Sequence, residues 1–121
     1  QSNYLAKLMQ RFGRTFAKDE VIFKQGDIAR NLHYLVNGQV TIVRDGKVIR
    51  TLSAGDYFGE MALLSNSPAT ADAIVTSTTA DVVVIYPDNI ETLLLEEPKV
   101  AMLFLRQMAT RLQTLNAGHA S

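Results

Sequence analysis

The chain has 121 residues, of which 47% are apolar, so it can bury one hydrophobic core and is too short for two comfortable domains. Its 12 basic and 12 acidic residues leave no net charge, which argues against the basic surface of a nucleic-acid-binding protein. Cysteine is absent, which excludes disulfides, thiolate nucleophiles and cysteine-ligated metal sites.

The ends of the chain and its apolar runs bear on location. No apolar run approaches the roughly 18 residues of a membrane span, and no signal peptide is apparent. We therefore expect a cytoplasmic protein with no membrane contact. Gln1, Ser2 and Asn3 are typical of an expression-tag remnant, so we predict a single domain over residues 4–121.

The first expected element is a short helix over residues 4–12. Apolar side chains recur there at spacings of three and four, which is the periodicity of one helix face: Leu5, Leu8, Met9 and Phe12.

From about residue 15 to residue 87 the pattern changes to short runs rich in Val, Ile, Thr and Tyr. Turn-forming pairs separate these runs at spacings of roughly 8 to 12 residues, which favours a β barrel or sandwich. The clearest hairpin joins residues 40–43 to residues 47–49 around Asp45-Gly46, a pair suited to a tight turn. Further strands are expected at residues 74–76 and 81–86.

Helical periodicity returns after Pro87. Asp88 is expected to cap a short helix that runs through Leu95. Pro98 is expected to begin a longer C-terminal helix over residues 98–116.

Residues 55–64, Gly-Asp-Tyr-Phe-Gly-Glu-Met-Ala-Leu-Leu, followed by Ser67-Pro68, resemble the phosphate-binding cassette of the cyclic nucleotide-binding domain family. Residues 21–38 also match the family's first strands and turns, and residues 107–113 are similar to the long helix of the bacterial catabolite activator class. The resemblance covers about residues 5–116. It implies a mainly β fold, a jelly-roll β barrel flanked by a short N-terminal helix and C-terminal helices.

The cassette sequence suits an anion site. Glycine at position 59 permits a close backbone approach, and a short helix beginning there would direct N–H groups, including that of Ala62, at a phosphate. The resemblance gives Glu60 the role of accepting from the ribose 2′-hydroxyl, and it places Phe58 and Met61 in the same site. The alternative is that Gly59 only forms a turn and Glu60 only stabilises a helix N-terminus.

The sequence departs from the family pattern at position 69, directly after Ser67-Pro68. Where the family has Pro-Arg, with the arginine bound to the phosphate, this chain has Pro68-Ala69. A hydrogen bond to a charged group contributes roughly 1.5 to 3 kcal/mol, or about ten- to a hundredfold in affinity, and alanine offers only its backbone N–H. Asp72, on a strand that lines the family's pocket, adds a negative charge. We therefore expect cyclic AMP to bind weakly or not at all.

Other residues are candidates for the remaining contacts. Arg111 aligns with an arginine near the ligand in the catabolite activator class and is the candidate cation; the alternative is a solvated residue or an ion pair with Glu60. Thr70 and Ala71 match positions that line the phosphate site. Asn116 matches a polar residue that contacts the purine from the partner subunit.

The last helix also carries an apolar series with the spacing of a coiled-coil seam, which predicts a homodimer. The alternative is one amphipathic helix that covers its own domain. The seam residues are Ala101, Leu105, Met108, Leu112 and Leu115.

An enzyme is not expected. A cupin-type metal site needs clustered histidines, and only His33 and His119 are present. A DNA-binding helix-turn-helix would have to follow Ser121, so this chain itself is not expected to contact nucleic acid. Two hypotheses remain. One is a sensor for a cyclic nucleotide or another small anion, for example the sensor part of a transcription regulator. The other is a degenerate module that binds no ligand and serves dimerisation or docking.

Overall fold

The computed structural model describes residues 2–28, 31–59, 68–99, 101–102, 105–106 and 109. The chain divides into two units, residues 1–87 and residues 88–121, and each is described by itself.

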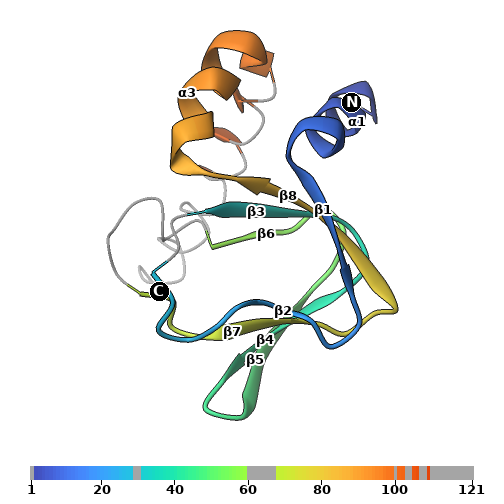
Figure 1. The fold of residues 1–121 in the computed structure, drawn as a ribbon, viewed down its shortest axis with the longest axis vertical. Coiled ribbons are helices and arrows are strands. Elements are labelled where there is room, and N and C mark those ends of the chain that lie inside the picture. Colours follow the sequence, from blue (N-terminus) through green and yellow to red (C-terminus); the bar gives the residue numbers. More distant parts are fainter. Residues whose placement is uncertain are drawn as a thin grey trace, which may run out of the picture. The chain divides into compact units, whose positions relative to one another are not determined.

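The first unit is mainly β, as the sequence predicts. Its helix α1 (Ser2–Phe12) leads into eight described strands, which pair as two antiparallel four-stranded sheets (Figure 1). One sheet has the order β1-β8-β3-β6 and the other the order β2-β7-β4-β5. The strands are β1 (Gly13–Ala17), β2 (Val21–Phe23), β3 (Leu32–Asn37), β4 (Val40–Arg44), β5 (Lys47–Leu52), β6 (Tyr57–Phe58), β7 (Asp72–Val75) and β8 (Thr79–Ile85).

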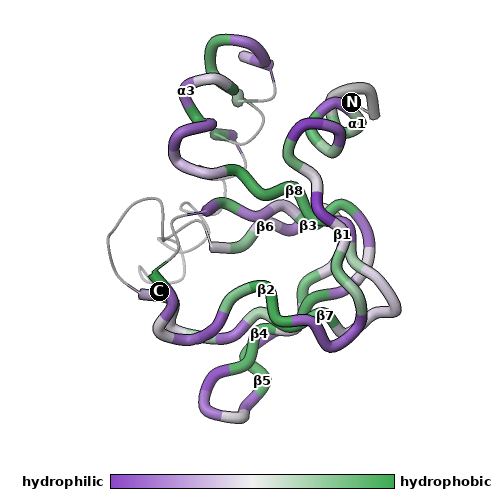
Figure 2. The backbone as a smooth tube through the Cα atoms, viewed as in Figure 1, coloured by the Kyte–Doolittle hydropathy of each residue, from purple (hydrophilic) through white to green (hydrophobic). Residues whose placement is uncertain are grey.

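The core of this unit lies between the two sheets. Because successive side chains of a strand point to opposite faces, alternate residues of both sheets meet there. Figure 2 shows β8 as largely hydrophobic, and three of its residues belong to this cluster. The buried cluster consists of Phe16, Leu35, Val40, Leu52, Phe58, Ala73, Val75, Ala80, Val82 and Val84. This packing of two sheets confirms the expected jelly-roll class.

The β4–β5 hairpin forms where the sequence predicts it. Arg44 pairs with Lys47, so Asp45 and Gly46 are the two turn residues, with φ angles of 52° and 78°. Two successive positive φ angles are what a type I′ hairpin turn requires, and an Asp-Gly pair tolerates them. The second strand continues to Leu52, beyond the predicted end at residue 49.

Other element boundaries also differ from the sequence prediction. Helix α1 begins at Ser2, before the predicted start at residue 4. Strand β7 covers residues 72–75 and not 74–76, because its pairing with β4 extends from Val75 back to Asp72. Directly after it, the Thr76 N–H donates to Gln39 O in the β3–β4 turn. Strand β8 begins at Thr79. Helix α3 (Pro87–Glu96) begins at Pro87, so Asp88 lies in its first turn and is not its cap. Proline suits a first helical position because its fixed φ matches the helix and its missing N–H is not needed there.

In the second unit, α3 is followed by residues 98–99, 101–102, 105–106 and 109, which are helical as expected for the C-terminal helix. The rest of the predicted helix, to residue 116, lies outside the described residues. None of the described helices is long and apolar enough to cross a membrane.

Candidate ligand-binding site

Gly59 follows β6 and is held close to β3. Its φ is +77°, and a Cβ added there would lie 3.0 Å from both the carbonyl oxygen of Asn31 and Nδ1 of His33. The position therefore requires glycine for its conformation and also for its space. The sequence interpretation expected a close approach to a ligand, and the close approach that the structure shows is to β3.

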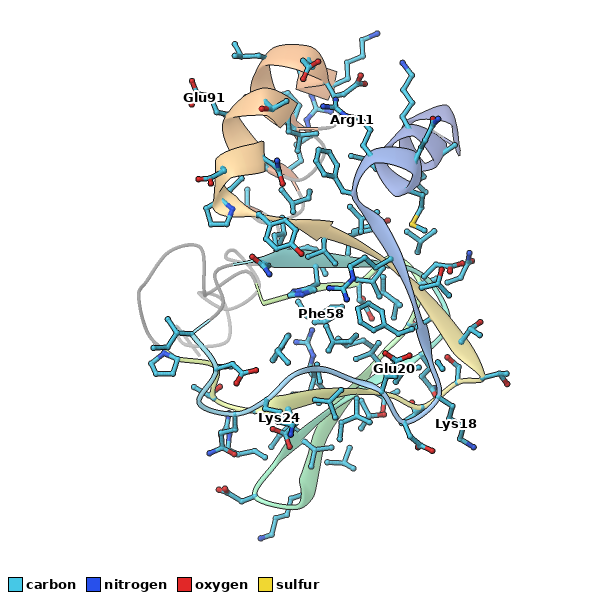
Figure 3. All side chains as sticks on the ribbon, viewed as in Figure 1. Arg11, Lys18, Glu20, Lys24, Phe58 and Glu91 are labelled. Atoms are coloured by element: carbon cyan, nitrogen blue, oxygen red, sulfur yellow. The ribbon has the colours of Figure 1, made fainter. Side chains whose placement is uncertain are left out.

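The ring of His33 packs directly against Gly59. It is 4% exposed, and its ring stacks on Phe58 at 4.9 Å and lies 5.4 Å from the ring of Phe23. Figure 3 shows Phe58 between the two sheets, so His33 belongs to the interior of the roll. Among the described residues, its buried Nδ1 atom has no hydrogen-bond partner.

Burial lowers the pKa of His33 to about 4, because the charged ring would lose its hydration. Polar backbone groups of Phe58 and Asn31 oppose this shift, and the positive charge of Arg14 adds to it. His33 is therefore neutral near pH 7. From the sequence, His33 was weighed only against a metal site, for which the chain has too few histidines. His33 and the apolar Leu35 are two residues apart in one strand and so share a face, which was the available sign that His33 faces the core.

The backbone of Ala69 is already paired. Its N–H donates to the Asp27 carbonyl at 2.9 Å, and its own carbonyl accepts from the Gly26 N–H at 2.8 Å. We expected this N–H to be the one group that alanine could offer a phosphate. In this structure the N–H is bonded to Asp27 instead, through a pairing between the turn after β2 and residue 69 that the sequence does not reveal.

Asp72 also differs from expectation. It alternates along β7 with the buried Ala71 and Ala73, so its side chain lies on the face opposite the core. Its Oδ1 accepts a hydrogen bond of 2.6 Å from the Gln25 N–H. The carboxylate therefore holds the turn after β2 and does not point into the interior of the roll.

Thr70 is exposed, and its carbonyl accepts a hydrogen bond of 3.1 Å from Nε of Arg44. Arg44 is the last residue of β4, which pairs with β7 so that Val43 lies opposite Asp72. The structure thus brings an arginine beside the Thr70 segment from a strand that the sequence analysis did not connect with the site. The strand pairing that brings them together is not visible in the sequence.

The other predicted site residues are distributed as follows. Phe58, Gly59, Ala69, Thr70 and Ala71 are described above. Glu60, Met61, Ala62, Met108, Arg111, Leu112, Leu115 and Asn116 lie outside the described residues. Of the predicted seam, Ala101 is 6% exposed and Leu105 is 52% exposed. The described residues contain no cluster of three or more histidine or acidic side chains that could hold a metal.

Comparison with known proteins identifies the family. The family model of the cyclic nucleotide-binding domain matches residues 13–97, which is more than half of the chain. The chain belongs to this family.

Individual relatives agree with this assignment. The chain is 36% identical over 70 residues to a cGMP-dependent protein kinase of Plasmodium berghei, covering 57% of this chain and 8% of that protein. It is 41% identical over 64 residues to a cAMP-dependent protein kinase regulatory subunit of Debaryomyces hansenii, covering 50% of this chain and 14% of that protein. The chain thus spans a small fraction of the curated relatives that it matches.

Among solved structures, the catabolite activator protein of Thermus thermophilus superposes with a TM-score of 0.75 at 24% identity, covering 97% of this chain and 57% of that one. This likeness concerns the fold. Together the comparisons make the chain a cyclic nucleotide-binding domain that resembles the cAMP and cGMP sensor domains of regulatory proteins.

Proposed function

We propose that this chain is a regulatory sensor domain that takes a cyclic nucleotide into the cassette between β6 and β7, with a weakened hold on the phosphate. The observation that best supports this function is the backbone at Gly59, which keeps a left-handed conformation directly after Phe58. The residues predicted to contact the ribose and the phosphate, Glu60 and Ala62, follow it in the sequence. We include no catalytic step in this function.

The weakness of binding follows from Ala69. Its side chain carries no charge, and its N–H is engaged by Asp27. Loss of a hydrogen bond to a charged group costs about 1.5–3 kcal/mol, so we expect binding to be roughly ten- to a hundredfold weaker than with arginine at this position.

The same observation favours a second candidate function. A cassette that has lost both its cation and this N–H could serve as a module for dimerisation or docking that binds no ligand. The half-exposed Leu105 supports an association through the last helix, for which we propose a homodimer. Whichever candidate holds, the chain is compatible with the sensor part of a longer regulator.

Calorimetric titration with cyclic AMP and cyclic GMP tests this function. The unaltered chain should bind at least one of them weakly, and Ala69→Arg should bind at least tenfold more tightly, because it restores a charge-assisted contact. Ala54→Arg is the control, because it adds the same charge at an exposed position of the β5–β6 turn. If neither the unaltered chain nor Ala69→Arg binds, the module without a ligand is the better account.

A further inference from the structure

We propose that Arg44 supplies the phosphate-binding guanidinium that this cassette lacks at position 69. The inference rests on the proposed function, because it names a residue of the same site. It identifies a cation on β4, outside the cassette segment itself.

The position of Arg44 follows from the register of the sheet. Val40 and Ile42 of β4 pair with Val75 and Ala73 of β7, and both contribute to the core between the sheets. Alternation along the strand gives Arg44 the same parity as these two residues. The side chain of Arg44 therefore leaves the backbone on the inner face of its sheet. Because Arg44 is the last residue of β4, it lies at the edge of the apolar core.

The side chain of Arg44 is directed to the cassette. Its Nε donates to the Thr70 carbonyl at 3.1 Å, in place of a continued backbone ladder between β4 and β7. A guanidinium is a rigid plane of N–H donors, so fixing Nε fixes the remaining donors beside residue 70. Two such N–H groups can donate in parallel to two oxygens of one phosphate.

The charges nearby leave this guanidinium available. No described carboxylate lies within ion-pair distance of Arg44. Asp72, the acidic residue of the neighbouring strand, is bonded to the Gln25 N–H on the opposite face of β7. A cation that no described carboxylate pairs with, next to Thr70 and one residue after the missing arginine, is the arrangement that an anionic ligand would stabilise.

Two features of Arg44 explain why its contact would be weaker than that of an arginine at position 69. One of its N–H groups is already used by Thr70, and its side chain is exposed, so water competes for the others. We therefore expect a weaker contact than an arginine in the cassette itself would make.

The test is a set of calorimetric titrations with cyclic AMP and cyclic GMP. Arg44→Ala should lower affinity about tenfold or more, which corresponds to the loss of one charge-assisted contact. Arg44→Gln keeps an N–H donor for Thr70 but no charge, and it should lose affinity to the same degree. Lys18→Ala is the control: it removes one positive charge at the exposed β1–β2 turn, which Figure 3 shows at the opposite end of β2 from Lys24, and it should bind like the unaltered chain.

Ala69→Arg separates the two claims. If Arg44 occupies the missing role, Ala69→Arg should raise affinity by a larger factor in the Arg44→Ala background than in the unaltered chain, because the two guanidinium groups serve one phosphate. Binding that Arg44→Ala leaves unchanged, or that Arg44→Gln restores, would overturn the role of Arg44 and leave the proposed function standing. Absence of binding in the unaltered chain and in Ala69→Arg would overturn both.

Discussion

Acid should destabilise this domain through His33. The unfolded chain protonates this histidine near its ordinary pKa of 6.5, whereas the folded chain holds the pKa near 4. A group with a lowered folded pKa contributes its stability above pH 6.5, and that stability is lost as the pH falls toward 4. From this difference the loss is about 2 kcal/mol at pH 5 and about 3 kcal/mol over the whole window.

The assay is urea unfolding at several pH values for the unaltered chain and His33→Phe. Phenylalanine retains an aromatic ring between Phe23 and Phe58 and removes Nδ1, to which the described part of the chain offers no hydrogen bond, so the variant should be as stable as the unaltered chain at pH 8. It should then become about 2 kcal/mol more stable than the unaltered chain at pH 5. Phe23→Leu is the control, because it perturbs the same packing without a titrating group. A stability difference between His33→Phe and the unaltered chain that does not change from pH 8 to pH 5 would refute this reasoning.

Three further changes test other parts of the structure. Gly59→Ala should cost about 1–3 kcal/mol more than Gly46→Ala in thermal unfolding; the two residues have φ angles of 77° and 78°, but only Gly59 has atoms within 4 Å of the added Cβ. If the two variants lost equal stability, the cost would come from the backbone conformation alone and the close contact at Gly59 would contribute nothing. Asp72→Thr should leave the affinity for cyclic nucleotides unchanged and cost about 1 kcal/mol of stability, since the Gln25 N–H loses a charged partner; a clear gain in affinity would return Asp72 to the pocket. Sedimentation should show a dimer at tens of micromolar that Leu105→Glu converts to a monomer, because the seam would bury an unpaired charge; a monomeric unaltered chain would rule out the seam.

Local chemistry made part of this fold predictable. The Asp45-Gly46 hairpin depends on two residues whose side chains permit positive φ, so the sequence locates it to the residue. The helix that begins at Pro87 was expected two residues late, with Asp88 as its cap, because aspartate and proline are both favoured at helix starts and only the fold decides between them.

The site was less predictable, because its properties depend on pairing between distant segments. The cassette pattern led to Gly59 directly. By contrast, the N–H of Ala69 is bound by Asp27, and the carboxylate of Asp72 by Gln25, across strands that are far apart in the sequence. Arg44 reaches Thr70 for the same reason, since β4 and β7 become neighbours only in the folded sheet.

The central claim is that a cyclic nucleotide enters the cassette between β6 and β7. The most direct measurement is a titration of the isotope-labelled chain with cyclic AMP and with cyclic GMP, followed through the backbone amide resonances. We expect saturable shifts of the Gly59 and Thr70 amides with at least one nucleotide, while the Lys18 amide in the β1–β2 turn stays unchanged. Spectra in which Gly59 and Thr70 do not move at millimolar nucleotide would contradict the claim.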